Sequence, residues 1–157
     1  MYESGAREEE IIRFLGWNLL QELNSSYLIR EESRIRNGVD VVGYLSAELG
    51  VGEAGRLLVE GMRSAGVPVA AVNYSKTISR QEDSFVADPA CRYDTLFAAV
   101  NADQLPVLCG DLATGVRENR YVIGQWLWEL ENLSSQFFDS FSLVDELWAP
   151  TEFIETM

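Results

Sequence analysis

The sequence contains no histidine and a single lysine, Lys76. The lack of histidine removes the commonest general base, the Ser-His and Cys-His nucleophile pairs, and histidine-based metal sites. With 25 acidic and 12 basic residues, the formal net charge is −13. Nucleic-acid binding needs clustered Lys and Arg, and adhesion to anionic lipid is disfavoured for the same reason. We therefore expect no nucleic-acid partner, no metal site and no cofactor.

Cysteines and long apolar runs are also scarce. Cys91 and Cys109 lie far apart and form no CxxC pair, so a reduced setting is expected. No apolar run approaches the roughly 20 residues of a membrane-spanning helix. Residues 1–10 are acidic and lack the basic-then-apolar order of a signal peptide. We expect no transmembrane segment and a cytoplasmic location. Peripheral association with the inner face of the membrane is compatible with this location.

The composition that remains is globular, with 47% hydrophobic and 11% aromatic residues among 157, enough for one domain with a core. Residues 7–24 predict an amphipathic helix, because Ile11, Leu15 and Leu19 recur at helical spacing. The polar stretch 25–38 ends in Asn37-Gly38, a turn signal. We therefore divide the chain into an N-terminal helix and linker at 1–37 and a domain at 38–157.

Beyond this boundary, apolar strands alternate with helices. Helices are expected at 53–65, within 102–115, at 134–141 and after Thr151. The expected strands are 39–45, 67–72, 95–101, 121–128 and 146–149. This order predicts a single α/β domain, a Rossmann-like parallel sheet with helices on both faces. Ligands of such sheets bind beyond the carboxyl ends of the strands, which directs attention to loops 46–53, 73–80, 101–104 and 128–134.

Residues 50–55 match the pattern GxGxxG, which in a dinucleotide site follows the first strand directly. Here residues 46–49 intervene, the second strand ends in Val72-Asn73-Tyr74 without an acidic residue, and Glu53 would repel a pyrophosphate. NAD or FAD binding is therefore disfavoured.

Two other interpretations of this loop remain open. Glycine backbone at a helix start favours an anion, to which Arg56 could add a charge. Alternatively, the glycines merely link a strand to a helix, and Arg56 is solvated.

A tryptophan-rich segment at 121–131 is the most unusual stretch. Strand alternation would put Trp126 and Trp128 on one face and Glu129 at the carboxyl end. Aromatic rings stack on sugars, and carboxylates accept hydrogen bonds from hydroxyls; the alternative is that the tryptophans pack under a helix. Glu129 and Glu131, roughly 6.5–7 Å apart in a strand, could also form a glycosidase pair, although adjacent acids are common in this acidic chain.

These motifs together resemble the N-terminal domain of family 4-type glycosyltransferases, which have the GT-B fold. The resemblance covers about residues 38–157 and depends on segments 41–56, 66–69, 121–131 and 144–153. The family has a Gly-Tyr-Trp-x-Trp-Glu-like strand and an Asp-Glu-x-Trp-x-Pro-Ser-x-Phe-like strand. This sequence has Gln125 where an aromatic is common and Thr151 where serine is common.

The resemblance implies that two Rossmann-like domains face each other across a cleft and that this chain is the N-terminal one. Gly50, Gly52 and Glu53 would belong to a donor-phosphate loop, with Arg56 just behind it. The acceptor cleft would contain Trp126, Trp128 and Glu129. The family's C-terminal domain, with its Arg/Lys pair and Glu-x7-Glu motif, has no counterpart here, and residues 1–37 match no part of the family.

We therefore expect the N-terminal half of a retaining glycosyltransferase that moves a hexosyl unit from a nucleotide-diphospho-sugar to a glycan or lipid acceptor. Such chemistry depends on stabilising the departing diphosphate more than on a strong base. The chain alone is expected to be inactive. The alternatives are a non-catalytic interaction module, whose exposed cleft face is covered by a partner chain or a dimer, and an NAD-dependent oxidoreductase.

Overall fold

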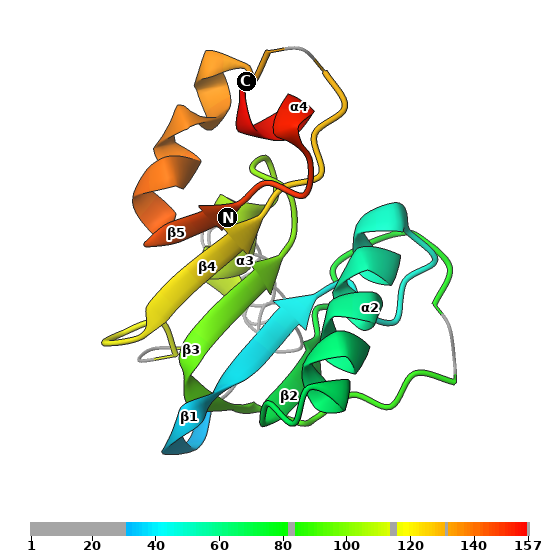
Figure 1. Ribbon diagram of the computed structural model, residues 1–157, viewed down its shortest axis with the longest axis vertical. Helices are drawn as coiled ribbons and strands as arrows, with labels where there is room; N and C mark the ends of the chain where they lie inside the picture. The colour runs from blue at the N-terminus through cyan, green and yellow to red at the C-terminus, as the bar shows by residue number, and fades with distance from the viewer. Residues whose placement is uncertain (1–30, 82–83, 114–115, 131, 157) are drawn as a thin grey trace, which may run out of the picture.

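The computed structural model describes residues 31–81, 84–113, 116–130 and 132–156 (Figure 1). The helix predicted at 7–24 lies outside the described residues. In chain order the elements are β1 (Glu31–Gly43), α2 (Gly50–Ser64), β2 (Val69–Asn73), β3 (Cys91–Ala99), α3 (Leu105–Asp111), β4 (Tyr121–Gln125), the 3₁₀-helix η1 (Ser135–Leu143), β5 (Glu146–Trp148) and α4 (Glu152–Glu155). Thr151 caps α4, as predicted, by accepting a hydrogen bond from the backbone N–H of Ile154.

The five strands form one all-parallel sheet in the order β2-β1-β3-β4-β5. Helix α2 covers one face, and α3 and η1 cover the other (Figure 1). The predicted α/β class and the Rossmann-like parallel sheet are therefore confirmed. The chain leaves β1 for β2 on one side and returns to β3 on the other. This arrangement makes the β1/β3 boundary the topological switch point, where ligands of open α/β sheets bind.

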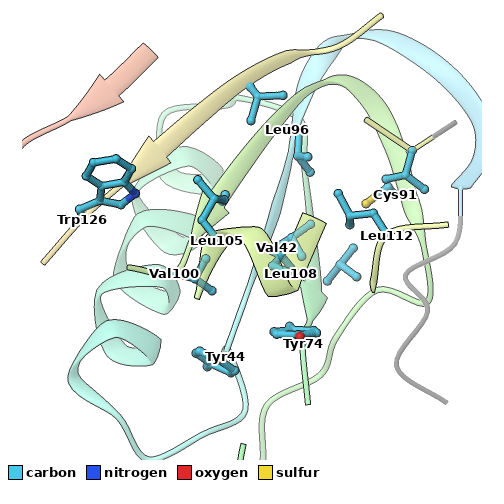
Figure 2. Close-up of a cluster of buried hydrophobic side chains, with 14 of the residues drawn as sticks. Val42, Tyr44, Tyr74, Cys91, Leu96, Val100, Leu105, Leu108, Leu112 and Trp126 are labelled. Atoms are coloured by element: carbon cyan, nitrogen blue, oxygen red, sulfur yellow. The ribbon is translucent and has the colours of Figure 1, made fainter. Parts of the chain in front are cut away.

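The sheet separates two apolar layers. On the α2 side, Val59 packs over Leu45 and Phe97. The larger layer, on the α3 side, includes Leu105 and Leu108 of α3 and extends to Trp126 beyond the end of β4 (Figure 2). Burial of both faces of β2 and of the later part of β3 explains why residues 69–72 and 96–99 are apolar runs without polar alternation.

Strand β1 begins much earlier than predicted, at Glu31 instead of Val39. Asn37 adopts a left-handed φ of 63°, and the pairing with β3 shifts register between Ile35 and Val39. The Asn37-Gly38 signal therefore marks an irregularity within a strand and no turn between elements. Polar residues in this stretch concealed the strand from a prediction that depended on apolar runs.

Two other boundaries near the predicted site also differ. Helix α2 begins at Gly50, so the glycines predicted as a loop form its first turn. Strand β4 ends at Gln125 and not at Trp128. Beyond Gln125 the backbone N–H of Leu127 donates to the side-chain oxygen of Asn101, at 2.8 Å, instead of to a neighbouring strand. Residues 126–130, which include both tryptophans of this segment, thus form a loop.

A buried ion pair and its hydrogen bonds link β1, β3 and the start of β4. Asp40 of β1 and Arg120, just before β4, both have fully buried side chains and form a salt bridge. The same carboxylate accepts hydrogen bonds of 2.9 Å from the backbone N–H groups of Arg92 and Tyr93 in β3. Asp40 therefore sets the relative positions of β1, β3 and β4 from within the core.

Strand β2 lies at one edge of the sheet, where Asp88 pairs with it. The Asp88 carboxylate accepts a 2.8 Å hydrogen bond from the N–H of Ala71, and the Asp88 N–H donates to the Ala71 carbonyl at 2.7 Å. The segment between β2 and β3 thus satisfies backbone groups of β2 that face away from β1.

Within the described ranges no helix is long and apolar enough to cross a membrane.

Candidate functional site

The loops that follow β1, β3 and β4 meet at the carboxyl edge of the sheet. The hydroxyl of Tyr44, after β1, donates to the side-chain oxygen of Gln104 at 3.1 Å. Asn101, after β3, accepts the 2.8 Å hydrogen bond from Leu127 in the loop after β4. The predicted glycine segment and the predicted tryptophan segment therefore lie on the same edge, on either side of the loop that follows β3.

The two glycines predicted to contact a donor phosphate differ in their surroundings. A Cβ on Gly52 would lie 2.5 Å from the carbonyl oxygen of Tyr44 and 2.8 Å from that of Ala47. Gly52 is buried and allows α2 to pack closely on the loop after β1. Gly50 is exposed, and a Cβ there would meet nothing within 4 Å. Of these two glycines in the first turn of α2, Gly50 is therefore accessible to a ligand and Gly52 is not.

Arg56, predicted to lie behind the loop as a phosphate ligand, contacts the protein itself. Its Nη1 donates to the carbonyl oxygens of Leu45 (2.9 Å) and Ala47 (3.1 Å). Its Nη2 lies 2.6 Å from the carboxylate of Glu53, whose side chain is 56% exposed. The guanidinium thus holds the loop after β1 against α2, and Glu53 compensates its charge.

Two further cations follow β2 at this edge, and each has a carboxylate partner. Lys76 lies 3.1 Å from Asp111 at the end of α3, and Arg80 lies 3.2 Å from Glu48. Tyr74 also donates to Asp111. Sequence reasoning missed this group, because Lys76 and Asp111 are 35 positions apart and no local pattern links them.

Tyr44 is a buried titratable group of this edge. Its side chain is 5% exposed, and its ring centroid lies 5.4 Å from that of Tyr74. Burial raises the pKa of the Tyr44 hydroxyl above 10, and the nearby carboxylates of Asp103 and Asp111 raise this pKa further. The hydroxyl therefore stays protonated, as its hydrogen bond to Gln104 requires.

This shift makes stability sensitive to alkaline pH. In the unfolded chain Tyr44 ionises near its ordinary pKa of 10, whereas in the folded protein it retains its proton to higher pH. Its contribution is fully present below pH 10 and is lost as pH rises from there through the folded-state pKa. In urea denaturation, we expect Tyr44→Phe to lessen the alkaline decline in the free energy of unfolding by up to about 1.4 kcal/mol per pH unit. An unchanged decline would contradict this assignment.

The tryptophan segment packs against η1. Trp126 is 1% exposed, and its ring meets that of Phe141 edge to face at 4.8 Å. Trp128 contacts Phe137 at 5.5 Å. Glu129, in contrast, is exposed. The structure thus gives the tryptophans the packing role that the sequence left open as an alternative, while Glu129 is accessible at the edge.

A cavity of about 550 Å³ lies at the carboxyl ends of β4 and β5, between η1 and α4. Trp126 forms part of its wall. The other lining residues come from the segment after β4, from η1 and from the last two elements: Asn132, Leu133, Phe138, Phe141, Leu147, Ala149, Ile154 and Glu155. Of these, sequence reasoning had singled out Trp126 alone, because the rest are apolar or surface-type residues in separate segments.

The described part of the chain contains no group of three or more Cys, Asp or Glu side chains arranged to hold a metal ion. The accessible features of the candidate site are the helix start at Gly50, the exposed carboxylate at Glu129 and the cavity beside Trp126. Comparison of the chain with protein-family models, curated proteins and solved structures gave no match.

Proposed function

We propose that this chain supplies the N-terminal half of a retaining glycosyltransferase that moves a hexosyl unit from a nucleotide-diphospho-sugar to an acceptor. The observation that supports the proposal most directly is the carboxyl edge at the β1/β3 switch point. There the accessible start of α2 at Gly50 and the exposed Glu129 lie on opposite sides of the loop after β3. A helix start favours a phosphate, and a carboxylate accepts hydrogen bonds from sugar hydroxyls.

The charges at this edge indicate which part of a full-length transferase would stabilise the departing diphosphate. Arg56, Lys76 and Arg80 each form a salt bridge with a carboxylate. A departing diphosphate needs strong electrostatic stabilisation, which these compensated cations do not supply. We propose that the stabilising positive charge comes from a second domain or chain. Residues 1–157 then bind the donor weakly and do not turn it over.

The test uses backbone amide NMR of residues 1–157 titrated with a UDP-hexose up to about 10 mM, in the weak-binding range. We expect shifts at Gly50, Val51 and Gly52, and no released nucleotide in a parallel turnover assay. Gly50→Asp is the matched variant. A carboxylate in the first turn is compatible with the helix dipole but repels phosphate, so folding is retained and the shifts disappear. Absence of shifts in the unchanged chain, or turnover by it, would refute the proposal.

A dinucleotide-dependent oxidoreductase receives less support. The residue that ends β2, Asn73, accepts a 2.8 Å hydrogen bond from the N–H of Ser46 and so holds the loop after β1. A neutral amide used in this way does not replace the carboxylate that a dinucleotide site places on the ribose. NADH added in place of the UDP-hexose is expected to cause amide shifts at residues 50–52 no larger than those that inorganic diphosphate causes.

An interaction module is the second candidate, and it is favoured by aromatic exposure near β5. Trp148, Phe153 and Tyr121 expose 39%, 51% and 48% of their surfaces. Exposed apolar groups of this size mark binding surfaces when they are contiguous. A dimer that forms with increasing concentration, that Trp148→Ser weakens and that a UDP-hexose leaves unchanged would favour this candidate.

A further inference from the structure

The cavity beside Trp126 has a wall chemistry that limits what can occupy it. Aromatic and aliphatic side chains form most of the wall, including Phe138, Phe141, Leu133 and Leu147. The polar groups of the lining residues are the side chains of Asn132 and Glu155 and the indole N–H of Trp126, which has no hydrogen-bond partner in the described residues. The lining contains no Lys or Arg. Its volume of about 550 Å³ falls in the range of small-molecule sites, which is about 300–1,000 Å³.

A sugar does not suit this wall. A pyranose carries several hydroxyl groups, and burying any of them without a hydrogen-bond partner is unfavourable. Asn132 and Glu155 can satisfy a small part of that demand. The indole of Trp126 meets Phe141 edge to face at 4.8 Å, so that side of the ring is occupied by packing and not by a sugar.

An anionic head group does not suit it either. Glu155 carries the formal charge of the lining, and the chain as a whole has a net charge of −13. A carboxylate or phosphate drawn into the cavity would meet like charge without a cation among these lining residues to offset it. An uncharged hydroxyl head can donate a hydrogen bond to Glu155, whose side chain is exposed at this end of α4.

We propose that this cavity binds the hydrocarbon portion of an uncharged, hydroxyl-bearing lipid. As the acceptor of the transfer proposed above, such a lipid would present its hydroxyl at the carboxyl edge of the sheet; this role rests on the proposed function, whereas the binding itself does not. Burial of hydrocarbon against these side chains supplies the affinity, which grows with the apolar surface removed from water.

The experiment measures binding of three probes to residues 1–157 by calorimetry at pH 8: 1-octanol, octanoate and maltose. We expect 1-octanol to bind, octanoate to bind at least tenfold more weakly, and maltose to show no binding. Glu155→Gln should narrow the gap between octanol and octanoate by raising octanoate affinity, because it removes the repelling charge. Tighter binding of maltose than of octanol, or a gap that Glu155→Gln leaves unchanged, would overturn the proposal.

A cavity-filling variant locates the binding. Ala149 lines the cavity and is partly buried, so Ala149→Phe should reduce octanol affinity at least tenfold while the melting temperature is retained. Val86→Phe is the matched control, since it adds the same ring at a position that is 83% exposed and outside the cavity. Equal octanol affinity in the two variants would refute binding at this site. If octanol binds but a UDP-hexose causes no shifts at residues 50–52, the lipid-binding proposal stands and the transferase proposal is refuted.

Discussion

Asp40→Asn is expected to destabilise the fold by about 3–5 kcal/mol, the cost of removing one partner from a buried ion pair. The substitution keeps the size of the side chain but removes the charge that compensates Arg120, whose side chain is fully buried. It also weakens the acceptor for the backbone N–H groups of Arg92 and Tyr93. Because small domains have about 5–15 kcal/mol of total stability, the variant should lose a large part of it.

Urea denaturation followed by far-ultraviolet circular dichroism measures this loss. Glu60→Gln, which removes an exposed carboxylate on α2, is the control and should change the free energy of unfolding by less than about 0.5 kcal/mol. The double variant Asp40→Asn with Arg120→Met should recover part of the loss, because the buried charge is removed as well. Equal effects of Asp40→Asn and Glu60→Gln would show that the pair does not hold the strands.

The second large effect is expected at Gly52. Gly52→Ala places a methyl group 2.5 Å from the carbonyl oxygen of Tyr44, a backbone atom that cannot rotate away. Helix α2 must then move off the loop after β1, at a cost of about 1–3 kcal/mol. Thermal and urea denaturation should both report the loss.

Gly50→Ala is the matched control two positions earlier in the same pattern. The new methyl group meets no atom within 4 Å, and alanine favours a helix over glycine by about 1 kcal/mol. We expect unchanged or slightly increased stability. Equal destabilisation by the two substitutions would contradict the packing role assigned to Gly52 and the accessibility assigned to Gly50.

The fold was predictable because the apolar parts of β1, β2 and β3 are buried on both faces. Apolar runs around Val41, Val69 and Leu96 alternate with helical patterns, and this order fixes a parallel sheet. The early part of β1 was not predictable in this way, since residues 31–36 are polar apart from Ile35 and pair with β3 through an irregular register. Strand pairing of this kind depends on the neighbouring strand and not on a local pattern.

The edge of the sheet that holds the candidate site was easier to predict than the contacts within it. The sequence placed the glycine loop and Glu129 beyond the carboxyl ends of the strands, and in the structure the start of α2 and the loop after β4 lie at this edge. It did not reveal that Arg56 would turn to the carbonyl oxygens of Leu45 and Ala47, because that geometry depends on where the chain goes after β1. The cavity was equally hidden, since its walls come from segments that meet only in three dimensions.

The pairing of Asp88 with Ala71 has a consequence for how this domain meets other chains. An open sheet invites a foreign strand wherever a long edge offers unpaired backbone groups. Here the backbone N–H and carbonyl of Ala71, in the middle of the edge strand β2, already pair with Asp88. The other edge strand, β5, has only three residues, Glu146–Trp148. Growth of the sheet by strand addition from another molecule is therefore disfavoured at both ends. A partner is left to approach through side chains, at the carboxyl edge or over the aromatic groups near β5, where recognition depends on shape and chemistry.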